Sequence, residues 1–140
     1  MGRNYTSKKQ RQIIKEKYNN RCAYSGTLLE DDWEVDHVIP IVHKTLLLEN
    51  PDKVDNIKNK VPVQKLINHY KRGLSLEEFR SWYLGKLHER FKKLPKNPYA
   101  EKSINRKKYL QKIANYFGIT PDKPFSGEFY FEKLKKDESG

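Results

Sequence analysis

The sequence of 140 residues has one cysteine, Cys22, and no long apolar run. A single thiol cannot form an intrachain disulfide, so nothing in the sequence calls for an oxidising compartment. No stretch approaches the roughly 20 apolar residues of a membrane span, and the N-terminus lacks the apolar region of a signal peptide. We therefore expect a soluble protein of the cytoplasm.

Acidic side chains are scarce relative to basic ones. The chain has 29 Lys and Arg against 18 Asp and Glu, a formal net charge of +11. The excess is uneven, because residues 1–20 carry +5 and residues 90–112 carry +8, whereas residues 28–56 carry −6. Basic regions on both sides of an acidic centre suit a nucleic acid bound around a cation. Charge alone leaves open the alternative of solvated helix faces.

Apolar residues make up only 36% of the chain, but two tryptophans, nine tyrosines and six phenylalanines supply aromatic surface. That surface is enough for one small core, and a chain of this length has room for one compact domain. We therefore expect a single domain over residues 1–140. Aromatic residues at helical spacing, such as Trp82 and Tyr83, are expected in its core rather than as base-stacking platforms.

Helices are predicted towards both ends of the chain. Ser7 can cap a helix that runs to about Tyr18, has Ile13 and Ile14 on its apolar face and ends at Asn19 and Asn20. Further along the chain, helical spacing and end signals predict three more helices. They cover residues 64–72 before Gly73, residues 75–94 with a capping box at the start, and residues 101–117 before Gly118.

Strands are predicted in the middle of the chain and near its end. Trp33 to Asp36 alternate apolar and acidic residues, as in a half-buried strand that ends at His37. Residues 60–63 form a second short strand, and Pro62 restricts it to a sheet edge. Residues 41–58 are a long connection without an assigned structure, residues 125–131 a late strand, and the last six residues a frayed end.

The polar residues between positions 36 and 68 have the chemistry of phosphodiester cleavage. An Asp36-His37 pair stands at a strand end and is followed by Asn59 and Asn68. Hydrolysis of a phosphodiester needs a proton acceptor, a cation that neutralises the phosphate and stabilisation of the leaving oxygen. A neutral imidazole suits the first task, and Asp and Asn oxygens hold a hard divalent cation for the others.

Three motifs carry a resemblance to a known family: Val35-Asp36-His37-Val38-Ile39-Pro40, Asn59-Lys60-Val61-Pro62-Val63, and Asn68 followed by Lys71. Together they resemble the HNH family of ββα-metal (His-Me finger) nucleases, of the small stand-alone type of phages and mobile elements. The resemblance covers residues 21–73. It implies an α+β fold with a ββα-metal core and flanking N- and C-terminal helices, the C-terminal extension covering residues 74–134.

The resemblance also implies roles for individual residues. His37 is the general base, Asp36 and Asn68 are the metal ligands, and Asn59 braces the loop that holds His37. Asn56 is the alternative to Asn59, since a slip of the loop would exchange them. The ion implied by oxygen ligands is Mg²⁺ or Mn²⁺.

Nucleic-acid contacts are expected from Lys71 and Arg72 at the end of the Asn68 helix. His43 is a further candidate, with plain solvent exposure as the equal alternative. His69 adjoins Asn68 on a helix and is expected to point elsewhere, because consecutive helical residues do not share a face.

Many members of the family hold a structural zinc with two Cys-x-x-Cys pairs. This chain has only Cys22, and Gln64 and Ile67 stand at the helix positions. One thiolate among four positions does not make a zinc site, so we expect no structural zinc and a small buried Cys22.

We therefore predict a metal-dependent HNH endonuclease that hydrolyses DNA, in a bacterial or phage-infected cell, and leaves 5′-phosphate and 3′-hydroxyl ends. One site nicks one strand, and a homodimer or a phage or host partner would allow double-strand cutting. Two alternatives remain open: a non-catalytic nucleic-acid-binding module, and a nuclease directed at RNA or acting as a toxin. No toxin delivery region is visible, which favours DNA.

Overall fold

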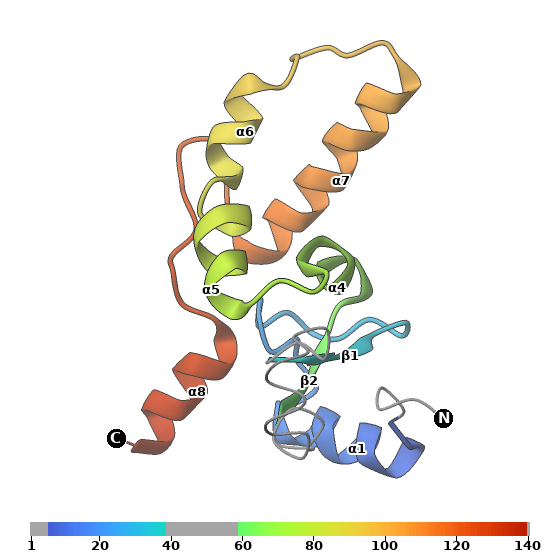
Figure 1. Ribbon diagram of the computed structural model, residues 1–140, viewed down its shortest axis with the longest axis vertical. Helices are drawn as coiled ribbons and strands as arrows, with labels where there is room; N and C mark the ends of the chain where they lie inside the picture. The colour runs from blue at the N-terminus through green and yellow to red at the C-terminus, as the bar shows by residue number, and fades with distance from the viewer. Residues whose placement is uncertain (1–5, 39–58, 140) are drawn as a thin grey trace. The chain divides into compact units, whose positions relative to one another are not determined.

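The computed structural model describes residues 6–38 and 59–139, which form helices and one two-stranded sheet (Figure 1). The protein is therefore of the mixed α+β class. The chain divides into two compact units, residues 1–76 with 129–140 and residues 77–128. In the described part of the chain, no helix combines the length and the apolar character needed to cross a membrane.

The first unit begins with helix α1 (Lys8–Lys17), as predicted. The Ser7 hydroxyl accepts a hydrogen bond from the Gln10 amide at 3.1 Å and thereby caps the helix. Asn19 and Asn20, with φ of 58° and 62°, end it in the left-handed region that asparagine tolerates better than most residues. One expectation was wrong: Ile14 is buried, but its neighbour Ile13 is 48% exposed, because only one of two consecutive positions faces the core.

Strands β1 (Glu34–His37) and β2 (Lys60–Val63) pair antiparallel, close to the predicted limits. Glu34 lies opposite Val63 and His37 lies opposite Lys60. All four residues of β2 are buried, because the chain segment around Ala23 covers its other edge and the Ala23 amide donates to the Pro62 carbonyl at 2.8 Å.

Helix α4 (Lys65–Lys71) follows β2 directly and packs against β1. The order of elements is therefore strand, antiparallel strand, helix. The prediction that Gly73 terminates this helix was wrong. Arg72 is the C-cap: its amide still donates to the Asn68 carbonyl one turn back, and its φ of 54° ends the helix.

The late strand predicted over residues 125–131 is absent from the described structure, where this segment leads into helix α8 (Tyr130–Ser139). Phe129 and Phe131 are both buried and their rings are stacked, with centroids 6.0 Å apart. Two aromatic residues separated by one position imitate the alternation of a strand. Here they pack against Tyr24 instead, and α8 continues through the residues expected to fray.

The single long helix predicted over residues 75–94 is divided into three parts, α5 (Leu76–Glu78), the π-helix η2 (Phe79–Leu84) and α6 (Leu87–Lys93). The break between η2 and α6 falls at Gly85, whose amide donates to the Arg80 carbonyl five residues back. A Cβ on Gly85 would lie 2.5 Å from the Ser81 carbonyl oxygen, so only glycine fits this wide turn.

The second unit also contains α7 (Glu101–Phe117), which ends at Gly118 with φ of 68°, as predicted. Helices α6 and α7 lie side by side (Figure 1). The core of this unit includes Phe79, Leu84, Leu87, Leu110 and Ile113. Trp82 was wrongly expected in a core: its side chain is 64% exposed, because the wide turn of η2 directs Phe79 and Leu84 inwards instead.

Candidate active site

Four polar side chains meet between β1 and α4. Glu34 and Asp36 share one face of the strand, since alternate residues of a strand point the same way. Asn68 and Lys71 share one face of the helix, three positions apart. The Asn68 amide nitrogen donates to Glu34 Oε1 at 2.8 Å, and Lys71 Nζ lies 3.0 Å from Asp36 Oδ2. Two strand carboxylates are thus each held by one residue of the helix.

Tyr24 is a third group on the Asp36 carboxylate. Its hydroxyl donates to Asp36 Oδ2 at 2.7 Å, and its buried ring makes edge-to-face contacts with Phe129 and Phe131, with ring centroids 5.2 and 6.1 Å away. Burial raises the pKa of Tyr24 well above its usual value, and the charge and hydrogen bond of Asp36 raise it further. Tyr24 therefore stays protonated and remains a donor that fixes the orientation of the carboxylate.

Two oxygen atoms of these side chains receive no hydrogen bond from the described residues. Both contacts of Asp36 fall on Oδ2, and no described residue donates a hydrogen bond to Oδ1. The Glu34 carboxylate can only accept, so the amide nitrogen of Asn68 must face it and the Asn68 carbonyl oxygen must face away. That oxygen also lacks a donor among the described residues. Hydrogen bonding therefore orients both predicted ligands.

The chemistry of these donors fits a hard divalent ion. Carboxylate and amide oxygens are the ligands that Mg²⁺ and Mn²⁺ prefer, and an ion of this kind keeps several waters. Within the described residues, no group of three or more His, Cys, Asp or Glu side chains is close enough to form a metal site. A cation here would therefore rest on Asp36 and Asn68, with Glu34 next to them and water or phosphate completing its coordination.

Lys71 lies inside the molecule rather than at its surface. Its side chain is 0% exposed and that of Asp36 is 12% exposed, so the ion pair is almost completely buried. This corrects the expectation that Lys71 contacts phosphate at the surface. The next residue, Arg72, is exposed at the end of α4 and remains a candidate for that contact.

His37 is the last residue of β1 and is 8% exposed. Because consecutive residues of a strand point to opposite faces, the side chains of His37 and Asp36 lie on different faces of β1. Asn59 lies beside this end of β1, because the Val38 amide donates to the Asn59 carbonyl at 2.9 Å. The structure thus brings Asn59 next to the chain at His37, and Asn68 next to the face of Asp36. His43 and Asn56 lie outside the described residues.

Gln64 joins the segment before β1 to the start of α4. Its fully buried amide donates to Thr27 Oγ1 at 3.0 Å and to the Leu28 carbonyl at 2.8 Å, and accepts from the Glu30 amide at 3.0 Å. Cys22 is a buried free thiol, as expected. An amide with three hydrogen bonds therefore fixes the start of α4 to the segment before β1.

Tyr24 and Glu34 were not predicted as site residues from the sequence, nor was the bracing role of Gln64. Glu34 was detectable, since the alternation that predicts β1 also puts it on the face of Asp36. Tyr24 had no signal in the sequence, because it reaches Asp36 only through the turn after α1 and the packing of Phe129 and Phe131.

No protein-family model matches the chain, and no curated protein or solved structure matches it significantly.

Proposed function

We propose that this protein is a metal-dependent endonuclease of the HNH type that hydrolyses phosphodiester bonds in DNA. The observation that supports this most directly is the pair of oriented ligand oxygens on Asp36 and Asn68. A buried ammonium and a buried tyrosine hydroxyl hold Asp36, and Glu34 holds Asn68. Burying charged and polar groups costs free energy. A module that only binds nucleic acid does not need a buried, oriented carboxylate at this place.

The order of strand, strand and helix supports the same proposal, because it is the order that a ββα-metal core requires. Asp36 and Asn68 would hold Mg²⁺ or Mn²⁺, which when bound neutralises phosphate charge and the departing 3′-oxygen. His37 takes the proton from the attacking water, and Asn59 braces the chain next to it. The products carry a 5′-phosphate and a 3′-hydroxyl.

The test is cleavage of supercoiled plasmid with Mg²⁺ and with EDTA. His37→Ala and Asp36→Asn are compared with His69→Ala and Asp32→Asn, which change the same residue types at exposed positions. We expect nicks or breaks that need the ion, disappear in the first two variants and persist in the two controls. Loss of a general base typically costs 10²–10⁴-fold in rate. Plasmid binding without any cleavage would instead support the non-catalytic module.

The same assay reports the number of strands cut. Nicked circles indicate one active site at a time, and linear plasmid in the first products indicates a dimer or a second partner. An RNA substrate of the same sequence tests the alternative that the enzyme is directed at RNA.

A further inference from the structure

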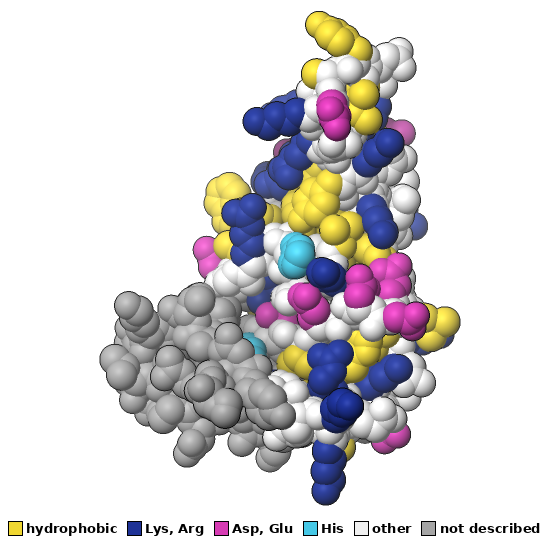
Figure 2. Space-filling model, turned by 90° about the vertical axis from the view of Figure 1, so that its right-hand side faces the viewer, with side chains coloured by type: hydrophobic (Ala, Val, Ile, Leu, Met, Phe, Trp, Pro, Cys, Tyr) yellow, Lys and Arg dark blue, Asp and Glu magenta, His cyan; other side chains and the backbone are white. Residues whose placement is uncertain are grey.

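The second unit, residues 77–128, has a strong excess of basic side chains. Residues 90–112, which cover most of α6, the connection and most of α7, contain nine Lys and Arg and one acidic residue. Figure 2 shows Lys and Arg side chains spread over the visible face of this unit. Solvated protein surfaces usually mix both signs, since charges of one sign repel each other.

Two adjoining clefts concentrate this charge. One has a volume of about 640 Å³ and includes Lys102 and Arg106 in its lining, and the other, of about 700 Å³, includes Lys92 and Lys96. Leu94 and Lys107 line both clefts. We refer to these two clefts as the basic clefts, and their basic side chains considered below are Lys92, Lys96, Lys102 and Arg106. All four side chains are exposed, and none of them forms an ion pair within the described part of the chain.

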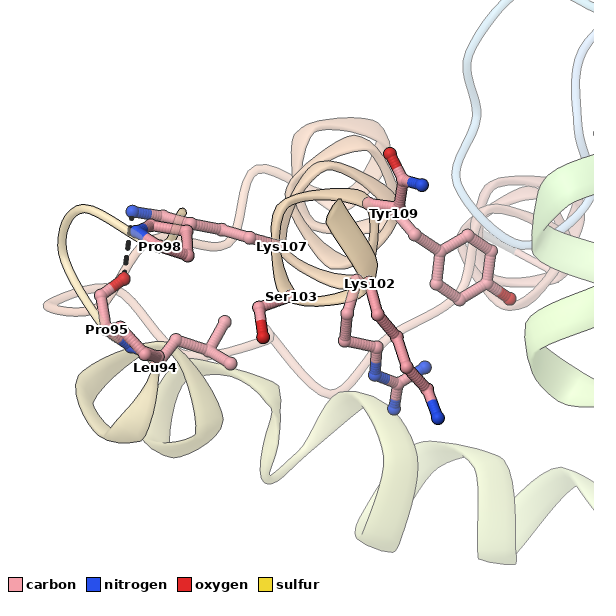
Figure 3. Close-up of a pocket in the computed structure, with 9 residues that line it drawn as sticks. Leu94, Pro95, Pro98, Lys102, Ser103, Lys107 and Tyr109 are labelled. Atoms are coloured by element: carbon pink, nitrogen blue, oxygen red, sulfur yellow. Dashed lines mark hydrogen bonds between the residues drawn. The ribbon is translucent and has the colours of Figure 1, made fainter. Parts of the chain in front are cut away.

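The clefts are held in shape by Lys107, whose ammonium donates to the carbonyls of Pro95 and Lys96 at 3.3 and 2.7 Å. Figure 3 shows Lys107 reaching from α7 to Pro95, while Lys102 projects from another side of the same helix. The connection between α6 and α7 is thereby fixed to α7. A ligand would meet a formed surface and would lose less conformational entropy on binding.

Asp122 is the one acidic side chain in the linings of these clefts, and the uncharged polar side chains are Ser103, Asn105, Tyr109, Gln111, Asn115 and Thr120. Together with Lys and Arg, these residue types make most contacts to phosphate and sugar oxygens in complexes with DNA. The stretch of α7 from Lys102 to Asn115 rises roughly 20 Å. That length matches about six base-pair steps of a DNA strand.

We propose that the basic clefts of the second unit dock the phosphate backbone of duplex DNA. The choice of DNA over another polyanion rests on the proposed function. The docking itself rests on the unpaired charge and the clefts, which are separate from the groups that would cut. Contacts of this kind position a duplex without reading its bases.

The experiment is fluorescence anisotropy of a labelled DNA duplex of about 30 base pairs, several times the span of the clefts. Binding is measured in EDTA, so that no cleavage occurs, at several salt concentrations around 0.1 M. The test variants are Lys102→Gln with Arg106→Gln, and Lys92→Gln with Lys96→Gln. The matched control is Lys133→Gln with Lys135→Gln, which removes two exposed charges from α8, a helix that also carries Glu132 and Asp137.

We expect each test variant to raise Kd by about tenfold or more and to reduce the salt slope by about two, one for each lost phosphate contact. The control should stay within about twofold of the wild type, and thermal melting of all variants checks the fold. Unchanged Kd and slope in the test variants, or an equal loss in the control, would overturn the proposal. Binding only to an RNA duplex or to phosphatidylserine vesicles would also overturn it.

The two proposals fail in different ways. A chain that binds the duplex through the basic clefts but never cuts plasmid rejects the nuclease and keeps the docking surface. A chain that cuts plasmid only when His37 is present, but whose cleft variants bind the duplex with unchanged Kd, keeps the nuclease and rejects the docking surface.

Discussion

Lys71 Nζ lies 3.0 Å from Asp36 Oδ2, and the lysine side chain is completely buried. A charge pair in this environment attracts strongly, but each partner has lost its hydration. Removing one partner therefore leaves the other as a poorly solvated charge. The pair also puts a positive charge at the carboxylate proposed to bind a cation, and both consequences can be measured.

Lys71→Met should lower the free energy of unfolding by about 3 kcal/mol, because it leaves the Asp36 charge without its ion-pair partner. Urea unfolding measures this, with Lys65→Met, at the exposed start of the same helix, as control. The double variant with Asp36→Leu should lose clearly less than the two single variants together. Additive losses would show that the ion pair contributes nothing of its own.

The second prediction concerns the affinity for a divalent ion without DNA. Removing the ammonium of Lys71 leaves Asp36 with its full negative charge, so Lys71→Met should bind Mn²⁺ about tenfold more tightly or better. Calorimetric titration of the DNA-free protein measures this. Asp36→Asn should bind the ion more weakly and Lys65→Met should behave as wild type. If Lys71→Met instead weakens ion binding, Lys71 orients the carboxylate rather than competing with the ion.

Tyr24→Phe should cost about 1.5–3 kcal/mol of stability at neutral pH, since it removes a hydrogen bond to a charged group and keeps the ring in contact with Phe129 and Phe131. The substitution should also change how the free energy of unfolding depends on pH above neutrality. The pKa of Tyr24 is raised well above its ordinary value of 10.0, so the folded protein holds a proton that the unfolded chain releases above that pH. Wild-type stability should therefore fall as pH rises past 10.0, and the fall should be less steep in Tyr24→Phe. Parallel curves would mean that Tyr24 does not contribute.

Gly85→Ala should destabilise the second unit by about 1–3 kcal/mol, because the new Cβ would overlap a backbone oxygen that cannot move independently of the helix. Ser81→Ala, at an exposed position of the same helical stretch, is the control and should change stability by less than about 0.5 kcal/mol. Thermal melting of both variants gives the comparison. A neutral Gly85→Ala would indicate that η2 can convert to a regular α-helix.

The sequence by itself determined the elements whose ends are set by a few neighbouring residues. Ser7 and Asn19 limit α1, and Gly118 limits α7, because capping and left-handed conformations depend on local hydrogen bonds and sterics. It also indicated the candidate ligands Asp36 and Asn68, because the residues around them resemble the motifs of the HNH family.

The tertiary structure decided what depends on distant partners. The sequence around Phe129 and Phe131 resembles a strand, but in the folded chain both rings pack against Tyr24. Lys71 resembles a surface lysine in the sequence, but in the folded chain it is buried in an ion pair with Asp36 of β1. Whether a side chain is buried, and which atom of a carboxylate is occupied, follows from contacts between segments far apart in sequence. Local propensity does not encode those contacts, because their free energy exists only after the chain has packed.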